Sequence, residues 1–398
     1  MKRTMTHFPQ IILWVFLFSN SCKPLDKSGV INENPGLENI NFSVEEAENW
    51  TSLFLRKTGW FGGDGIFAIP LNGKDNIPAG KETQTMIIFS DSMIGEIVEG
   101  EIQEQHMVNN TVAILKGGKP DEHKISFHWA KNEEGKPKSL FTPQTPSASG
   151  GDDYWLGDGF LNPQLDSTIY IFAYRMRTMD KTEDWSFKEM GTDLIALPTG
   201  SLPPFSNQRQ IETPLRFEDG GFGAGIFVNT KEAQAGNPDG YIYVYGVRGT
   251  EKKLMVARVL LRDFENFEAW RFWDGSGWNV DMQQVTFLTA GVSNELSVSE
   301  LPDGRYALIF TINGINPVVG MRLSKTPFGP FGPMIEIWKS NEMEQKNFIT
   351  YNAKAHSNLS ASGEILISYN VNAFDFGSEI QANPNLYRPR FIKLKIEQ

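Results

Sequence analysis

The sequence contains very little cysteine and no long apolar run. Its 398 residues include one cysteine, Cys22, so no disulfide can form within the chain. The most apolar segment, from Phe8 to Phe18, is shorter than the about 20 residues that a membrane-spanning helix needs. These absences exclude a small disulfide-stapled domain and a mature membrane-spanning helix in this segment.

Concentrated positive charge is also lacking. The formal net charge is -11, and lysine and arginine form no long cluster, so we expect no nucleic-acid partner. The spacings HxH, HExxH and CxxC are absent, which argues against a catalytic zinc. No Gly-x-Ser-x-Gly elbow or phosphate-cradling Gly-Lys-Ser/Thr loop is evident either.

The N-terminal residues resemble a bacterial lipoprotein signal. Lys2 and Arg3 precede the apolar run, and "SNSC" ends at Cys22. We expect cleavage before Cys22 and a lipid on its thiol, giving a monomer anchored in the bacterial cell envelope, at the outer membrane, cell surface or periplasm. An ordinary secretory signal with an incidental cysteine is the alternative. The next residues, 23–40, are polar and contain Gly and Pro, as in a flexible tether.

From residue 41 to residue 398 the pattern is that of one large β domain. Short runs rich in β-branched and aromatic residues recur between Gly, Asn, Asp and Pro, for example "STIYIFAYRM" and "GRYALIFTI". One segment predicts a helix, Asn41 to Lys57, with Ser43 as N-cap and Glu46 three residues later. The fold class is therefore all-β.

The strand-like runs group into five approximate repeats. The sections begin near Trp60, Trp155, Phe222, Asn294 and Ala353. Each has a polar, small-residue first strand and then strongly apolar strands, which predicts a five-bladed β-propeller. Because propeller blades direct their first strands toward a common channel, residues on these strands are expected to converge.

A Gly-Asp-Gly triplet occurs at two of these first strands. It stands in "WFGGDGIFAIPL" (Trp60 to Leu71) and again in "YWLGDGFL" (Tyr154 to Leu161). Glycine permits tight turns and close backbone approach, so Asp64 and Asp158 are each held at a strand entrance. Two turn-forming aspartates are the alternative. The repetition favours equivalent acids presented at the floor of one pocket.

Several segments, in their order along the chain, resemble the five-bladed propeller glycosidases. They include "GDGIFAIPL", "FSDSMIG", "NNTVAIL", "YVYGVRG", "SNELSV", "TPFGPFG" and "AKAHSNLSASGEILISYNVN". More narrowly, they are similar to the bacterial domain-of-unknown-function 4185 family, some members of which are assigned as endo-D-arabinan hydrolases. The resemblance covers Trp60 to Lys395. It implies a β-propeller that hydrolyses a polysaccharide, such as an arabinan or another furanoside-containing glycan.

The resemblance also implies a set of catalytic acids. Glycoside hydrolysis uses two carboxyl groups, one as acid and one as base or nucleophile. The matching positions are Asp64 as base or nucleophile, Asp158 as orienting acid and Glu295 as proton donor. Glu295 lies in the fourth section, whereas the family pattern has its glutamate in the third, where Glu218 and Asp219 are the alternatives.

Aromatic and polar residues near these acids are candidates for substrate binding. Aromatic faces can stack on sugars, and arginine can bind carboxylate or sugar oxygens. Core packing, turn formation and salt bridging are the alternatives. The candidates are Trp60, Asp91, Asn110, Trp155, His356, Arg388 and Arg390.

No cofactor is required, although His356 and surrounding carboxylates could hold a structural calcium ion. Two other functions stay open. One is a non-catalytic glycan-binding surface lipoprotein, which would have aromatics without an acid pair. The other is a structural lipoprotein that joins surface complexes, which would have a broad apolar patch.

Overall fold

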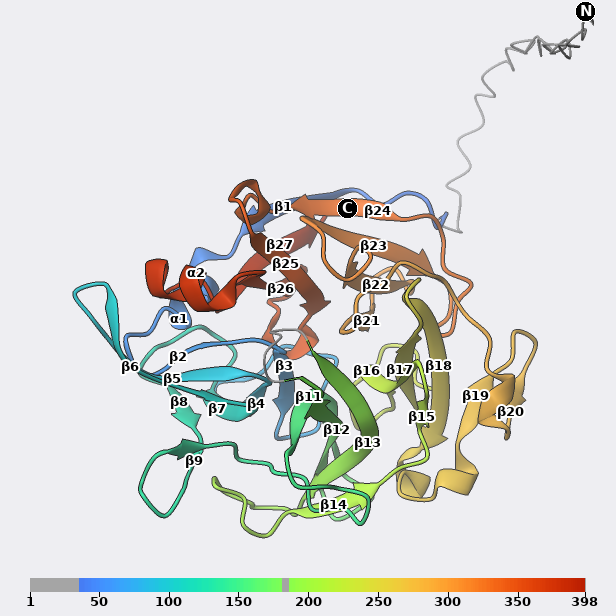
Figure 1. The fold of residues 1–398 in the computed structure, drawn as a ribbon. Coiled ribbons are helices and arrows are strands. Elements are labelled where there is room, and N and C mark those ends of the chain that lie inside the picture. Colours follow the sequence, from blue (N-terminus) through green and yellow to red (C-terminus); the bar gives the residue numbers. More distant parts are fainter. Residues whose placement is uncertain (1–35, 181–185, 398) are drawn as a thin grey trace, which may run out of the picture. The chain divides into compact units, whose positions relative to one another are not determined.

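The computed structural model describes residues 36–180 and 186–397. These residues contain 27 strands and two short α-helices, α1 (Glu48–Leu53) and α2 (Phe376–Ala382), which confirms the all-β prediction (Figure 1). In the described ranges no helix has the length and apolar character to cross a membrane. The predicted signal, Cys22 and most of the predicted tether lie outside the described residues.

Within the described residues, five sheets have four or more strands. Each of the first four begins with its innermost strand and continues outward as an antiparallel meander. The first is β3 (Phe67–Pro70), β4 (Gln84–Phe89), β7 (Thr111–Lys116), β8 (Ile125–His128); the second is β11 (Asp152–Asn162), β12 (Thr168–Thr178), β13 (Phe187–Leu197), β14 (Arg209–Glu212). The third is β16 (Gly220–Asn229), β17 (Tyr241–Arg248), β18 (Lys253–Leu260), β19 (Arg271–Trp273), β20 (Trp278–Asn279), with β15 (Arg216–Phe217) beside β16; the fourth is β21 (Ser297–Glu300), β22 (Tyr306–Thr311), β23 (Val318–Ser324), β24 (Ile335–Lys339).

The fifth sheet joins the two ends of the domain. It is built from β25 (Phe348–Ala355), β26 (Glu364–Ala373), β27 (Pro389–Ile396) and β1 (Phe42–Glu46). β1 pairs antiparallel with β27, from Phe42 opposite Ile396 to Glu46 opposite Ile392. The N-terminal strand therefore completes a sheet whose other strands come from the C-terminal end of the chain.

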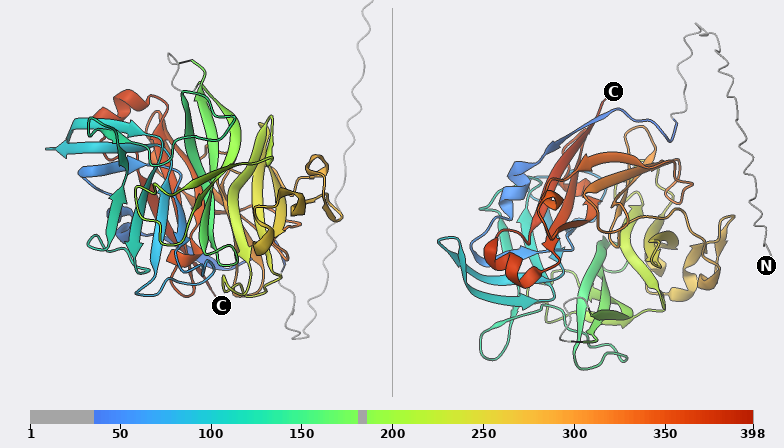
Figure 2. Two further views of the ribbon diagram at one scale, coloured as in Figure 1. Left: turned by 90° about the horizontal axis from the view of Figure 1, so that it is seen from below. Right: turned by 45° about the horizontal axis from the view of Figure 1, so that its top comes forward.

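The innermost strands of the five sheets surround a common centre (Figure 1 and Figure 2). β3 contacts β11, β11 contacts β16, β16 contacts β21, and β21 contacts β25. The short helix η5 (Ser357–Leu359) follows β25 and contacts β3, which closes the ring. Contacts between these strands explain why residues that are distant in the sequence converge.

Smaller sheets complete the described strands. β2 (Thr58–Gly63), β5 (Ser92–Val98) and β6 (Glu101–Val108) form a three-stranded sheet, and β9 (Ala130–Lys131) pairs with β10 (Pro137–Lys138). The three-stranded sheet interrupts the first repeat, which the sequence did not predict. As a result Asp64 lies between β2 and β3, whereas Asp158 lies inside β11.

The helix predicted from Asn41 to Lys57 is wrong in its first half. Residues 42–46 form β1, with Phe42 and Val44 turned toward the core and their neighbours exposed. This alternation has the period of a strand, and pairing with β27 supplies the hydrogen bonds. The helix starts at Glu48, and Ala47 occupies its N-cap position without a side-chain bond.

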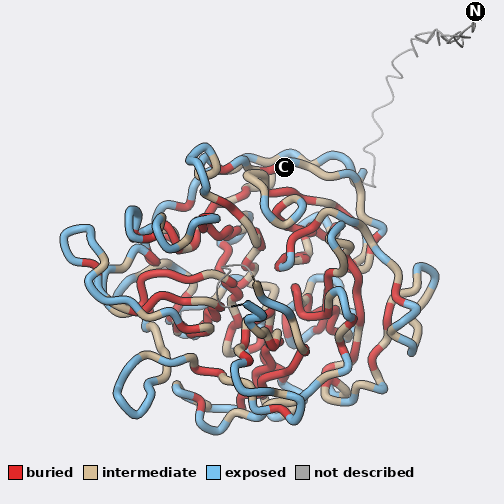
Figure 3. Tube along the Cα trace, in the orientation of Figure 1, coloured by how far each residue is buried: buried red, intermediate tan, exposed pale blue. Residues whose placement is uncertain are grey.

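Five apolar clusters fill the spaces around the sheets, and Figure 3 shows the buried residues concentrated along the strands. One cluster joins the β11 sheet to the β16 sheet through Phe172, Phe222 and Val244. Leu37 and Ile40 pack against another. The last residues of the predicted tether therefore contact the domain.

Candidate active site

Irregularities in the inner strands bring polar side chains to the centre. In β11, Gly157 and Asp158 interrupt the register with β12, and in β25, Asn352 and Ala353 interrupt the register with β26. Asn352 has a positive φ of 56°. Extra residues of this kind bend a strand and redirect its side chains. Asp158 and Asn352 are carried by these two irregularities.

The glycines beside the two aspartates are required by close packing. At Gly65, which has φ +66°, an added Cβ would lie 2.7 Å from Ser90 Oγ. At Gly159 it would lie 2.5 Å from the carbonyl oxygen of Tyr170. Real Cβ atoms do not approach other atoms so closely, so each triplet combines a carboxylate with a backbone that only glycine permits.

Four carboxyl groups from different segments meet in this region: Asp64, Asp91, Asp158 and Glu295. Asp64 interacts electrostatically with both Asp91 and Glu295, and Glu295 also interacts with Asp158. Asp64 and Asp91 are direct neighbours, because the backbone N–H of Asp64 donates to the carbonyl of Asp91 at 3.2 Å. The structure thus brings together the three predicted acids and Asp91.

Asp64 is surrounded by hydroxyl donors. The Tyr351 hydroxyl donates to Asp64 Oδ2 at 2.7 Å, and the Tyr387 hydroxyl also hydrogen-bonds to this carboxylate. Burial raises the pKa of Asp64 to about 6, and the charge of Glu295 acts in the same direction. The two hydroxyls limit the rise because they stabilise the charged form. At neutral pH Asp64 is therefore a carboxylate.

Asp91 is held more strongly in its protonated form. Its Oδ1 accepts hydrogen bonds from Trp155 Nε1 at 3.1 Å and from Asn109 Nδ2 at 3.3 Å. Burial, followed by the charge of Asp64, raises the pKa of Asp91 to about 8. Asp64 and Asp91 are both half-buried, so solvent reaches part of each residue. A neutral carboxyl group therefore lies beside a charged one.

Asp158 is fixed by the backbone. Its Oδ1 accepts from the N–H of Gly159 at 2.8 Å, and its Oδ2 accepts from the N–H of Ile226 at 2.7 Å. Burial raises the pKa of Asp158 to about 7, and these two bonds oppose the increase. Because the second bond joins β11 to β16, Asp158 ties two inner strands together.

Glu295 forms an ion pair. Lys354 Nζ lies 2.5 Å from Glu295 Oε2, and Asn352 Nδ2 donates to Oε1 at 2.8 Å. The Lys354 side chain is only 1% exposed. Burial raises the pKa of Glu295 above its ordinary value, and the Lys354 ammonium acts in the opposite direction. The ion pair therefore limits the increase that burial causes.

Of the four acids Asp64, Asp91, Asp158 and Glu295, Asp158 is the one that lines a small polar cavity of about 60 Å³. Its lining includes Asp158, Lys354, His356 and Asp75. His356 is buried and hydrogen-bonds Ser368 Oγ at 2.7 Å; burial and then Lys354 lower the pKa of His356 to about 3, so its ring is neutral. Burial and then the charge of Asp158 raise the pKa of Asp75 to about 8.

Trp60 and Asn110, two of the predicted substrate-binding residues, have structural roles. Trp60 is 1% exposed and stacks on Phe127 in the core. Asn110 is fully buried, and its amide is bonded to the backbone of Phe141 and Tyr154. The structure therefore does not support either one as a sugar ligand.

The two predicted arginines, Arg388 and Arg390, also form contacts within the protein. Arg388 donates to the Thr51 carbonyl at 3.2 Å, and Arg390 pairs with Glu342 at 3.5 Å. The third-section alternatives lie on the surface: Glu218 is exposed, and Asp219 is exposed and pairs with Arg248. These contacts account for Arg388, Arg390 and Asp219 without a ligand.

The sequence reading missed Tyr351, Lys354, Asp75 and Tyr387. A signal existed for Lys354, because alternate residues of a strand share one face and Lys354 stands two residues before His356 in "KAHSN". Tyr387 directly precedes the arginines of "YRPRF". Asp75 comes from the loop after β3, and its Oδ2 has no hydrogen-bond partner in the described structure.

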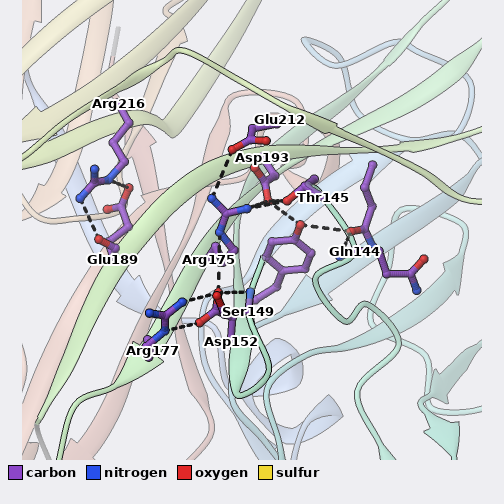
Figure 4. A network of polar contacts seen from close by, with 12 residues as sticks. Gln144, Thr145, Ser149, Asp152, Arg175, Arg177, Glu189, Asp193, Glu212 and Arg216 are labelled. Carbon is purple, nitrogen blue, oxygen red and sulfur yellow. Dashed lines mark hydrogen bonds and ion pairs between the residues drawn. The ribbon is translucent and has the colours of Figure 1, made fainter. Parts of the chain in front are cut away.

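A buried ionic network supports the strand that carries Trp155 and Asp158 (Figure 4). Arg175 on β12 is 3% exposed and lies 3.3 Å from Asp193, 3.6 Å from Glu212 and 4.0 Å from Asp152. Asp152 is the first residue of β11. The network therefore fixes the start of this inner strand to its neighbours.

In residues 36–180 and 186–397, no group of three or more His, Cys, Asp or Glu side chains is arranged to hold a metal ion. The calcium ion suggested for His356 stays a prediction.

Comparison with known proteins gives a family and a fold. Residues 47–396 match the family described as "Domain of unknown function (DUF5005)". No curated protein matches the chain. A crystal structure of a proposed hydrolase from Bacteroides ovatus ATCC 8483 is similar, with a TM-score of 0.68 and 17% identity over 92% of this chain and 97% of that one. At this identity the likeness is one of fold.

Other similar structures include glycoside hydrolases. An α-L-arabinofuranosidase from Podospora anserina has a TM-score of 0.43 and 11% identity, covering 84% of this chain and 97% of its own. An exo-β-1,3-galactanase from Phanerochaete chrysosporium has a TM-score of 0.43 and 11% identity, covering 83% and 60%. The resemblance to the domain-of-unknown-function 4185 family is not confirmed by these matches.

Proposed function

The chain belongs to the DUF5005 family, whose description assigns no activity, and we propose that it is a glycoside hydrolase with a carboxyl pair at the centre of its inner strands. One observation carries the proposal: Asp64 and Asp91 are neighbours joined by the Asp64 N–H to Asp91 carbonyl hydrogen bond, and burial raises their pKa to about 6 and about 8. Two adjacent carboxyl groups with separated pKa values can act as base and acid at neutral pH. Glycosidic bond cleavage requires this combination.

The environments of the two groups suggest their roles. Asp64, charged and supported by tyrosine hydroxyls, acts as nucleophile or as the base that activates water. Asp91, protonated and half-buried, donates its proton to the leaving-group oxygen. The sequence resemblance assigned the proton donor to Glu295, but the ion pair with Lys354 makes Asp91 the better acid in this geometry. Asp158, held by two backbone N–H groups, orients the neighbouring strands.

The substrate in this proposal is a polysaccharide, with an arabinan or another furanoside-containing glycan as the class that the sequence resemblance implies. Trp155 supports this, because it is half-buried beside Asp91 and its ring centroid lies 4.5 Å from that of Phe187. Aromatic side chains suit the apolar faces of sugars. The five large sheets are taken as five propeller blades.

The location is part of the proposal. We propose that a lipid on Cys22 anchors the chain in the bacterial envelope, which would place the site near extracellular or periplasmic glycan. Mass spectrometry of the membrane fraction should find the lipid on wild type, whereas Cys22→Ser should be soluble or remain an unprocessed precursor. Wild-type protein without a lipid would contradict this part alone.

A panel of neutral and acidic polysaccharides tests the activity. We expect hydrolysis by wild type and a loss in kcat of at least about a hundredfold in both Asp64→Asn and Asp91→Asn, because general acid–base catalysis contributes about 10²–10⁴-fold. Asp219→Asn is the matched control, since Asp219 is exposed and outside the cluster. Full activity in both site variants would disprove the pair, and binding without hydrolysis would favour the non-catalytic alternative.

A further inference from the structure

Lys354 is an unusual residue to find at the centre of a fold. Its side chain is 1% exposed, with Nζ 2.5 Å from Glu295 Oε2 and 4.5 Å from the centroid of the Phe67 ring. An ammonium group is costly to bury unless a partner offsets the lost hydration. An apolar residue of similar length could fill the same space. The charge itself therefore calls for an explanation.

The surroundings of Lys354 are mostly acidic. Glu295 precedes β21, Asp64 follows β2 and Asp158 lies on β11; Lys354 acts against the raised pKa of each of the three. Within the described residues it is the one cationic side chain that acts on all three. Two further titratable groups, His356 and Asp75, line the same cavity as Lys354.

The two oxygens of Glu295 have different neighbours: Oε1 has a hydrogen bond, and Oε2 has an ion-pair contact. Oε1 accepts from the Asn352 amide at 2.8 Å, and Oε2 faces the Lys354 ammonium. An ammonium group has three donors and no acceptor, so a proton on Oε2 would face another donor. A charged Oε2 is attracted to the ammonium, whereas a protonated Oε2 would place its O–H against a group that only donates.

We propose that Lys354 is a positioning residue that keeps Glu295 a carboxylate, so that Glu295 accepts hydrogen bonds from sugar hydroxyls and does not donate the catalytic proton. The inference rests on the proposed glycoside hydrolase activity and extends it to the division of roles among the acids. It assigns different roles to Glu295 and Asp91, which both interact with Asp64.

Titration of the Glu295 carboxyl group tests the pairing without any need for activity. The ¹³C signal of Glu295 is assigned by its disappearance in Glu295→Gln and followed with pH in wild type, in Lys354→Met and in Lys395→Met. Loss of the ammonium should move the Glu295 titration upward by about 1–3 pH units, the effect of a close opposite charge. Lys395→Met, which removes an exposed lysine paired with Glu45, should leave it unchanged. An unchanged titration in Lys354→Met overturns the proposal.

Kinetics test the role of Glu295. Glu295→Gln keeps an acceptor oxygen but loses the charge, so KM should rise while kcat falls by less than about a hundredfold, the smallest loss expected when a strong general acid is removed. A larger fall in kcat would make Glu295 the acid and overturn the proposal. If wild type hydrolyses no glycan, the proposed function fails, and the ¹³C titration still decides whether Lys354 holds Glu295 charged.

Melting temperatures test the pairing even if Lys354→Met folds poorly. If Lys354→Met is too unstable to titrate, the double variant Lys354→Met/Glu295→Gln should melt at a higher temperature than Lys354→Met alone, because it no longer buries an unpaired charge. A double variant that melts no higher than Lys354→Met would show that the two residues are not coupled, and would also overturn the proposal.

Discussion

At the scale of single residues, Asp64 and Asp91 make activity depend on pH in a defined way. Below about pH 6 Asp64 binds a proton and can no longer act as base or nucleophile, and above about pH 8 Asp91 loses the proton that it must donate. We therefore expect a bell-shaped profile of kcat/KM with limbs near these two values. Because the two carboxyl groups interact, the apparent pKa value of each limb describes the pair and not one residue alone. A profile flat from pH 5 to pH 9 would contradict the assignment.

The Tyr351 hydroxyl offers a finer test of the acid limb. In Tyr351→Phe the carboxylate of Asp64 loses a donor at 2.7 Å, so its pKa rises and the acid limb moves to higher pH. The basic limb should stay in place. Tyr369→Phe is a suitable control, because the Tyr369 hydroxyl bonds Glu342 outside this cluster. An acid limb that stays at its wild-type position in Tyr351→Phe would argue that Asp64 is not the group that titrates there.

Residue identity was predictable where a repeated pattern existed. Asp64 and Asp158 stood out because the same triplet occurs twice, and the structure brings both to the centre. Trp60 and Asn110 could not be separated from site residues in this way, because an aromatic or amide side chain looks the same whether it faces a pocket or the core. The direction in which each side chain points is set by strand register and irregularities, which the sequence does not display.

At the scale of elements, the buried network on β11 to β14 carries a prediction about stability. Arg175→Met would leave the buried carboxyl group of Asp193 without its arginine, whereas Asp152 keeps Arg177 at 2.6 Å. Breaking such a pair typically costs about 3–5 kcal/mol, which we expect as a lower midpoint in chemical denaturation. Arg209→Met is the control, since its exposed pair with Glu265 should be worth about 0–1 kcal/mol. Equal effects of the two substitutions would contradict this account.

Element boundaries were less predictable than element types. The apolar strands β4, β12, β17, β22 and β26 were visible as runs of β-branched and aromatic residues. Residues 42–46 were assigned to a helix, although Phe42 and Val44 already had the spacing of a strand. Local cap signals favoured the helix, and pairing with β27, some 350 positions later in the chain, decided the outcome. A local pattern does not contain that contact.

At the scale of the whole molecule, convergence follows from the ring of inner strands. The sequence analysis predicted five repeats and, from them, that distant acids would meet; contacts between the inner strands provide the physical basis of that meeting. The extra sheet of β2, β5 and β6 was not visible, because β6 is mostly polar and exposed and β2 contains three glycines. It matters for the site, since Asp91 lies in the connection from β4 into this sheet.

The closure of the fifth sheet gives the last prediction. β1 covers β27 along five residue pairs, and Glu45 forms ion pairs with Lys393 at 2.9 Å and Lys395 at 3.0 Å. A chain that starts at Ala47 would expose the edge of β27 and lose the apolar contacts of Phe42 and Val44. We expect it to be destabilised by at least about 2 kcal/mol and to aggregate through the open edge.

A chain that starts at Leu37 keeps β1 and should melt at the same temperature as the longer protein. Differential scanning calorimetry and light scattering of the two shortened chains, measured side by side, make the comparison. Because β25 of the same sheet carries Tyr351, Asn352 and Lys354, the loss of β1 should also lower activity by loosening these side chains. If the chain from Ala47 is as stable, as monomeric and as active as the chain from Leu37, then the sheet closes without its N-terminal strand and β1 has no part in holding the site.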